Sequence, residues 1–180
     1  MAVEPLTTVY RQDWYALFVK TGSEKAIQHK LNYLAIDQLD FHVPCRQMRI
    51  RRKGKWTMDL QPMFPGYILV NGRLTDASYA RVSQIAGVYY WISDASGPLR
   101  IHPDEIQLIC RLIDSNDVIR PSMILCSGQR ITVIDGPLQG LEAMIKKVDH
   151  RKGRVKIALS MFGTERLVDI PVEDVLCPAD

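Results

Sequence analysis

The sequence predicts an α+β fold that continues into a small five-stranded β-barrel, which gives two domains within 180 residues. Strand and helix patterns alternate over residues 10–114, as expected of a mixed sheet covered by helices. Short strand patterns separated by glycine-containing turns fill residues 127–180, as in small barrels. Residues 115–126 begin with a polar run and lack a clear hydrophobic period, so we expect a linker there.

The first domain opens with a distinct strand–helix unit. Trp14–Val19 is an apolar run of strand length. A helix is expected after Ser23, a favourable N-cap residue, with Glu24 in the first turn where an acid is stabilising. Its predicted buried face consists of Ile27, Leu31 and Leu34.

Residues 41–61 change to a period of two. Polar and apolar residues alternate on both sides of a Lys53-Gly54 turn, which predicts a β-hairpin. We expect it to have one cationic face and one apolar face, the latter formed by Met48, Ile50, Trp56, Met58 and Leu60.

A proline–glycine turn follows within Gln61–Val70, where two prolines precede Gly66. The prolines favour extended backbone, and the glycine permits a tight bend. We expect this turn to present Phe64 and Tyr67 close together before the next strand. The alternative is a corner whose aromatic rings pack in the core.

Further elements complete both domains. Residues 75–85 are expected to form a second helix and Val88–Ile92 a strand, while Pro103 followed by two acids predicts the start of a third helix. In the tail, the predicted strands are Arg130–Ile134, Glu142–Val148, Arg154–Leu159, Glu165–Ile170 and Asp174–Leu176.

The formal net charge is only +3, but the cationic residues are concentrated. Arg46–Lys55 contains six of them and no acid, and Lys146–Lys156 contains six and one acid, Asp149. Such segments are typical of surfaces that bind polyanions. The alternative is an ordinary solvated face.

The four cysteines, Cys45, Cys110, Cys126 and Cys177, lie far apart and form no C-x-x-C pair. This pattern favours idle cytosolic thiols over a disulfide framework or a metal site. Because there is no signal-peptide pattern and no apolar run of about eighteen residues, we expect a cytoplasmic protein with no membrane partner. No cofactor is expected, and the absence of a nucleophile or phosphate-loop motif argues against an enzyme.

The sequence resembles the NusG/Spt5 family of transcription elongation factors over almost its whole length. The matching residues in the first domain are Trp14-Tyr15, Phe64–Val70 and Gly87-Val88, and in the tail Gly128–Gly140 resembles a KOW motif. The resemblance implies an NGN-type α/β sandwich followed by an SH3-like KOW barrel, and we expect a monomer. Within the family, Leu141–Val148 is most similar to the specialised antiterminators of the LoaP type.

The resemblance also implies that the first domain binds the clamp coiled coil of RNA polymerase through Phe18, Phe64, Pro65 and Tyr67. Rigid aromatic side chains suit such a contact, because they bury a large area at a small entropy cost. A bridged clamp opens less readily, so pausing and termination should decline. The alternative for Phe18 is a place in the core.

Nucleic-acid contacts are implied in both domains. The positions at which relatives touch non-template DNA correspond to Lys20, Lys30, Arg81, Ser83 and Gln84; the alternative is ordinary surface charge. The cationic tail segment predicts a surface for a nascent or leader RNA hairpin. That surface consists of Lys146, Lys147, Arg151, Lys152, Arg154 and Lys156.

Two other functions fit the sequence. One is a general elongation factor whose barrel binds a ribosomal protein or a termination factor. The other is a ribosome-associated KOW protein that binds RNA. The aromatic turn disfavours the second, because a protein that binds only RNA has no need of a polymerase-docking surface.

Overall fold

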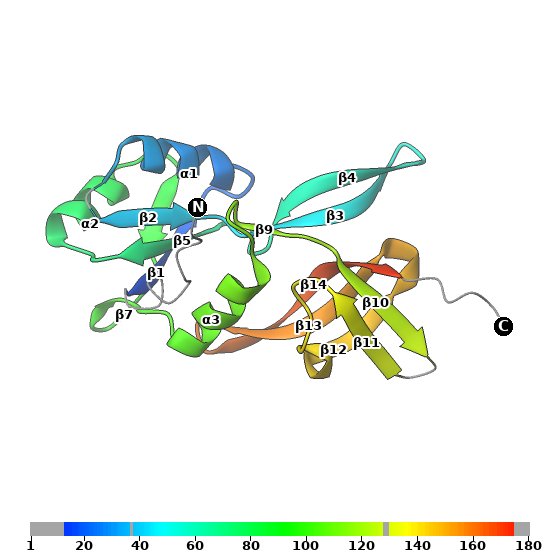
Figure 1. The fold of residues 1–180 in the computed structure, drawn as a ribbon. Helices are drawn as coiled ribbons and strands as arrows, with labels where there is room; N and C mark the ends of the chain where they lie inside the picture. Colours follow the sequence, from blue (N-terminus) through cyan, green and yellow to red (C-terminus); the bar gives the residue numbers. More distant parts are fainter. Residues whose placement is uncertain (1–12, 37, 128–129, 175–180) are drawn as a thin grey trace, which may run out of the picture. The chain divides into compact units, whose positions relative to one another are not determined.

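The structure is a computed structural model that describes residues 13–36, 38–127 and 130–174 (Figure 1). The fold is α+β, as predicted, and its described part consists mostly of strands with three α-helices. The chain divides into two compact units. The first unit contains the described residues up to Val43 and the segment Phe64–Gln107, and the second contains Pro44–Met63 and the residues from Leu108 onward.

The first unit is built on a four-stranded sheet of order β2-β5-β1-β6, in which all neighbouring strands are antiparallel. Its strands are β1 (Trp14–Val19), β2 (Leu39–His42), β5 (Tyr67–Gly72) and β6 (Val88–Trp91). Helix α1 (Glu24–Tyr33) contacts β2 and β5, and α2 (Asp76–Ser83) contacts β6. A two-residue ribbon pairs β7 (Ser93–Asp94) with β8 (Gly97–Pro98).

The helices of the first unit differ in detail from their predicted form. Ser23 is the N-cap residue of α1, as predicted, but its side chain makes no capping hydrogen bond. Leu34 lies after the last helical residue and is exposed, so only Ile27 and Leu31 of its predicted face are buried. Helix α2 is capped by Thr75, whose side chain accepts a hydrogen bond from the backbone N–H of Ser78 in a capping box.

The second unit contains a five-stranded sheet of order β11-β10-β14-β13-β12. Its strands are β10 (Ser122–Ser127), β11 (Arg130–Asp135), β12 (Ile145–Asp149), β13 (Arg154–Met161) and β14 (Thr164–Asp174). Two 3₁₀ turns, η2 (Glu142–Met144) and η3 (His150–Lys152), flank β12. Helix α3 (Pro103–Leu112) begins at Pro103 as predicted, and the boundary between the units falls within it.

Four of the five predicted tail strands are present, as β11, β12, β13 and β14, but the fifth strand of the sheet is β10, which was not predicted. The segment expected to be a linker contains β9 (Val118–Ile119) and all but the last residue of β10, and β10 is an internal strand between β11 and β14. Alternate burial of Ser122 and Ile124, with Met123 exposed between them, is the period-two signal in this segment. The predicted strand Glu165–Ile170 continues to Asp174, and the rest of Asp174–Leu176 lies outside the described residues.

The β-hairpin is present, but its predicted faces are wrong. It pairs β3 (Cys45–Arg52) with β4 (Lys55–Pro62), and the register sets Arg51 opposite Trp56 and Arg49 opposite Met58. Directly opposed residues share a face of an antiparallel pair, so the arginines and the apolar residues of β4 lie together. The Arg49 guanidinium lies 4.8 Å from the centroid of the Trp56 ring, a cation–π contact.

Contacts with the C-terminal sheet explain why the hairpin belongs to the second unit. The Arg46 guanidinium donates to the carbonyl oxygen of Asp169 at 2.9 Å and to that of Pro62 at 3.3 Å. Strand β9 also pairs in parallel with β3, with Cys45 opposite Val118.

None of the helices in the described part of the chain has the length and apolar character needed to span a membrane.

Candidate functional site

A cluster of four aromatic rings lies on three adjacent strands of the first unit. We call Phe18, Tyr67, Tyr89 and Tyr90 the aromatic patch. The Phe18 ring is central, with centroid distances of 5.3 Å to Tyr67, 5.1 Å to Tyr90 and 6.0 Å to Tyr89. Tyr89 and Tyr90 are 60% and 56% exposed, while Phe18 and Tyr67 are half-buried.

The strand register explains how these rings meet. Phe18 on β1 is directly opposite Tyr67 on β5 and Tyr90 on β6. Consecutive residues of a regular strand point to opposite faces, so Tyr89 would normally point away from Tyr90. The β1–β6 register shifts between Phe18 and Val19, which leaves Tyr89 as the extra residue of a β-bulge. The bulge lets two successive tyrosines reach one phenylalanine.

Gly66 lies against the central Phe18 ring of the aromatic patch. Its φ is +84°, and a Cβ there would lie 2.9 Å from Cε2 of Phe18. Its carbonyl oxygen accepts from the Val19 N–H at 2.8 Å, and its own N–H donates to Oε1 of Glu24 at 2.7 Å. Glu24 is buried, so its carboxylate joins α1 to the turn that precedes β5. Glycine adopts this positive φ without strain, and because it has no Cβ it leaves room for the Phe18 ring.

The structure changes the predicted composition of this surface. Phe64, expected to be presented by the turn, is only 6% exposed, whereas Pro65 is exposed. The Phe64 carbonyl accepts from the Tyr67 N–H where the chain reverses, and the Phe64 side chain packs in the core instead of at the surface. Tyr89 and Tyr90 were missed, although an aromatic pair within a strand pattern was a visible signal.

The residues predicted to contact DNA lie on different elements of the first unit. Lys20, Lys30, Arg81 and Gln84 are exposed, and Lys30 and Arg81 are in the last turns of α1 and α2. The Ser83 hydroxyl is engaged within the protein instead. It donates to the Tyr79 carbonyl at 2.8 Å and accepts from Nε1 of Trp91 at 3.2 Å.

The cationic tail segment forms a surface that carries its own acids. Lys147, Lys152, Arg154 and Lys156 line a pocket of about 190 Å³. Asp149 and Asp169 line the same pocket. We call these six residues the cationic pocket. Arg151 and Lys146, the remaining predicted RNA-binding residues, are exposed on η3 and β12.

Asp169 neutralises much of this pocket. Its carboxylate accepts from Nζ of Lys156 at 2.9 Å and from the Arg154 guanidinium at 3.2 Å. Burial alone would raise the pKa of Asp169, but the hydrogen bonds and charges of Lys156 and Arg154 outweigh it and hold the pKa below its ordinary value. Asp149 lies 3.8 Å from Nζ of Lys152. The count of cations in the sequence therefore overstates the charge available to a ligand.

Two of the thiols, those of Cys110 and Cys126, are held in their neutral form. Cys45 and Cys110 are buried and Cys126 is half-buried, all three unbridged, and Cys177 lies outside the described residues. Burial, with the charge of Asp117 adding to it, raises the pKa of Cys110 to about 11. Burial and the charge of Asp174 likewise raise the pKa of Cys126. A thiol held in its neutral form is a poor nucleophile, so neither Cys110 nor Cys126 has the character of a catalytic cysteine.

Comparisons with known proteins agree on one family. The family model described as transcription termination factor nusG matches residues 12–110. The chain is similar to the transcription termination/antitermination protein NusG of Buchnera aphidicola, at 25% identity over 92% of this chain and 96% of the relative. The corresponding protein of Pseudomonas aeruginosa is 26% identical over 90% of this chain and 96% of the relative.

A solved structure supports the fold. NusG of Thermotoga maritima superposes with a TM-score of 0.55 at 20% identity, covering 91% of this chain and 95% of that chain. At this identity the likeness bears on the fold alone.

Proposed function

This chain belongs to the NusG family of transcription termination/antitermination factors, and we propose that it docks on RNA polymerase through its aromatic patch. The observation that carries the proposal is the row of rings from Tyr67 through Phe18 to Tyr90 across three adjacent strands. Soluble proteins seldom leave such a group of aromatic residues exposed without an interaction to serve.

The patch suits the tip of a polymerase coiled coil. Tyr89 and Tyr90 offer apolar ring faces with a hydroxyl at the rim, which is the residue type that dominates binding energy at protein interfaces. Phe18 and Tyr67 are held by their ring contacts and by the Gly66 turn, so little entropy is lost when a partner binds. A factor seated on the clamp would favour its closed state, and pausing and termination would decrease.

The test is the binding of the full chain to purified RNA polymerase. Replacing Tyr89 and Tyr90 together by alanine removes two largely exposed rings, so the fold should be retained. Affinity should fall at least about tenfold, since truncating a hot-spot residue costs about 2 kcal/mol or more and a tenfold loss corresponds to about 1.4 kcal/mol. Tyr33→Ala on α1 is the matched control, because Tyr33 is 88% exposed and belongs to the same unit but not to the patch.

Two results would contradict the docking proposal. One is unchanged polymerase affinity in the Tyr89/Tyr90 variant when its circular dichroism spectrum and unfolding curve match those of the original protein. The other is an equal loss in Tyr33→Ala, which would mean that tyrosines anywhere on this unit contribute.

For the C-terminal unit we propose RNA binding at the exposed cations in and next to the cationic pocket. Lys146, Lys147, Arg151 and Lys152 are exposed, whereas the Arg154 side chain is only 21% exposed and already paired. A clustered set of exposed cations on β12 and η3 fits the phosphates of a leader RNA hairpin, because backbone contacts are mainly electrostatic. Non-template DNA is a further proposed partner, through Lys20, Lys30 and Arg81 of the first unit.

Charge reversal separates this RNA surface from general electrostatics. Arg151→Glu should weaken hairpin binding and reduce its salt dependence, while Arg130→Glu on β11 makes the same change of net charge outside the set. If both variants weaken binding equally, the attraction is general and the KOW-type assignment of this surface fails.

We propose a specialised factor of the LoaP type rather than a general factor, because the Leu141–Val148 segment resembles LoaP. In the structure this segment forms the turn η2 and most of strand β12. Deleting the gene and measuring transcription across the genome distinguishes the two. A specialist should change few operons. Broad changes in pausing would instead indicate a general factor whose second unit binds a ribosomal protein or a termination factor.

A further inference from the structure

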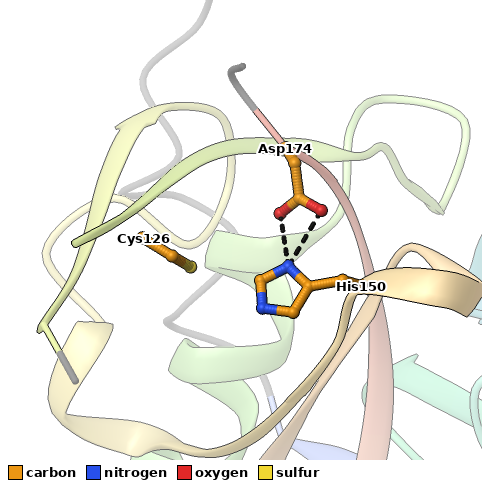
Figure 2. Close-up of side chains that lie close together, drawn as sticks. All are labelled: Cys126, His150 and Asp174. Atoms are coloured by element: carbon orange, nitrogen blue, oxygen red, sulfur yellow. Dashed lines mark hydrogen bonds and ion pairs between the residues drawn. The ribbon is translucent and has the colours of Figure 1, made fainter. Parts of the chain in front are cut away.

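Three side chains with metal-binding chemistry converge at one end of the C-terminal sheet. They are Cys126 of β10, His150 of η3 and Asp174 of β14, and their ligand atoms all lie within 4.8 Å of one another (Figure 2). Each is separated from the next by 24 residues, so no local spacing motif reveals them in the sequence. The tertiary fold alone brings them together.

The backbone explains how His150 reaches Asp174. Gly153, which ends η3, has a φ of +60°, and a Cβ on it would lie 3.1 Å from the Val172 carbonyl oxygen. The Val172 N–H donates to the Gly153 carbonyl at 3.0 Å, so η3 lies directly against β14. Asp149 also fixes the turn, because its side chain accepts from the Lys152 N–H at 3.0 Å. His150 is thereby held beside Asp174, which lies two residues after Val172 in β14.

The atoms already face one another. Nδ1 of His150 lies 3.0 Å and 2.9 Å from the two carboxylate oxygens of Asp174, and the Cys126 side chain lies beside the imidazole ring (Figure 2). A hydrogen bond at Nδ1 holds the histidine and aspartate together. A metal ion that takes the place of this hydrogen bond needs only a small separation of the two groups.

We propose that Cys126, His150 and Asp174 form a binding site for a zinc-class divalent metal ion. A thiolate, an imidazole and a carboxylate are the three side-chain ligand types that Zn²⁺ accepts. The thiolate and the carboxylate together balance the two positive charges of the ion. The sulfur and nitrogen ligands favour Zn²⁺ over Mg²⁺ or Ca²⁺, which prefer sets made up of oxygen.

The surroundings leave room for a fourth ligand. His150 and Asp174 line a pocket of about 510 Å³, together with Glu173 and Gly153 from the same unit. Water from this pocket could complete a tetrahedral site, as in zinc sites with three protein ligands. The side chains of His150 and Asp174 are 56% and 34% exposed, so an ion can enter from solvent. Binding would join β10, η3 and the end of β14.

Titration of the full-length protein with Co²⁺ and Zn²⁺ tests the site. The protein is first treated with a chelator and kept reduced with a phosphine. One equivalent of Co²⁺ should bind and produce a thiolate-to-cobalt charge-transfer band, which Zn²⁺ should displace and excess Mg²⁺ should not. Zn²⁺ should also raise the thermal unfolding midpoint, since a ligand that binds the folded state stabilises it.

Single substitutions assign the ligands. Cys126→Ser should abolish the cobalt band, and His150→Ala and Asp174→Asn should each weaken Zn²⁺ binding by more than about 100-fold, because even outer-shell partners cost about 10–100-fold. Cys177→Ser and His29→Ala are the matched controls for a second thiol and a second exposed histidine, and both should bind as the original protein does.

The outcomes are decisive in either direction. Absence of binding by the original protein, or equal affinity in all five variants, would overturn the proposal. So would a cobalt band that depends on Cys177 and survives Cys126→Ser. Unfolding curves of the metal-free variants show whether a loss of binding reflects a lost ligand or a lost fold, and Asp174→Asn changes only a partly exposed group.

Discussion

The aromatic patch and the cationic pocket were both suggested by side-chain type, but the structure treats them in opposite ways. In the aromatic patch, pairing across strands adds to what the sequence shows, because it brings Tyr89 and Tyr90 to Phe18. In the cationic pocket, pairing across strands lowers the free positive charge that the sequence suggests. Asp169 on β14 is opposite Lys156 on β13 and accepts hydrogen bonds from two of the cations.

The difference follows from the physics of the two interactions. Neighbouring aromatic rings stabilise one another and remain available to a partner on their exposed faces. Neighbouring like charges repel, so a folded sheet that gathers cations is stabilised by acids among them. A count of cations is therefore an upper bound on the charge of such a surface, whereas a count of aromatic residues errs in both directions, because Tyr89 and Tyr90 are gained and Phe64 is lost to burial.

The largest expected effect concerns Gly66, which lies against the Phe18 ring of the aromatic patch. Gly66→Ala should lower the free energy of unfolding by about 2–4 kcal/mol, because it places a side chain at positive φ and overpacks the Phe18 ring. Chemical denaturation measures this directly. Displacement of Phe18 should weaken polymerase binding by the same variant.

Gly54→Ala in the hairpin turn is the matched control. Its φ of +82° is nearly that of Gly66, but a Cβ there meets nothing within 4 Å. Gly54→Ala should therefore lower the free energy of unfolding only by the cost of placing alanine at positive φ, about 1–2 kcal/mol. If the two variants were equally destabilised, the contact between Gly66 and Phe18 would contribute nothing.

A second, smaller effect distinguishes the two surfaces by their response to salt. A double-mutant cycle with Phe18→Leu and Tyr90→Leu should give a coupling energy of about 1 kcal/mol. This coupling should be the same in low and high salt, because both rings are neutral. The corresponding cycle for Lys156 and Asp169 should give a smaller coupling that decreases as salt is added. A ring coupling that decreases with salt would contradict the comparison.

The sequence was sufficient where a local signal determined the outcome. Trp14–Val19 forms its strand because it is an apolar run, and α3 begins at Pro103 because proline suits a first helical position. Strand β10 was missed, because Pro121 and the preceding polar run concealed a short alternating segment. The faces of the hairpin were wrong because composition assigned them, whereas the register of β3 against β4 decides which side chains share a face.

The candidate site was predictable to the extent that it depended on one strand at a time. Phe18 and Tyr67 lie together, as the family resemblance implied, but the burial of Phe64 depends on how the turn packs. The bulge that re-aims Tyr89 has no signature in its own residues. The neutralisation of Arg154 and Lys156 depends on an acid on another strand, so no reading of Lys146–Lys156 alone could have included it.

The smallest expected effect is a dependence of stability on pH in the cationic pocket. Because the pKa of Asp169 is held below its ordinary value of 3.8, its ionised form stabilises the fold. This contribution is fully present above the ordinary value and is lost as the pH falls through the lowered one. Asp169→Asn lacks it at every pH, so the variant should be less stable than the original protein by up to about 1 kcal/mol at neutral pH.

Denaturant unfolding at a series of pH values measures this difference. The gap between the two proteins should stay constant at neutral pH and narrow as the pH falls below 3.8. Asp135→Asn on the edge strand β11 is the control, since Asp135 is an exposed acid of the same sheet. A gap that widened in acid would mean that Asp169 is destabilising when ionised, and the cationic pocket would then carry more free charge than its hydrogen bonds imply.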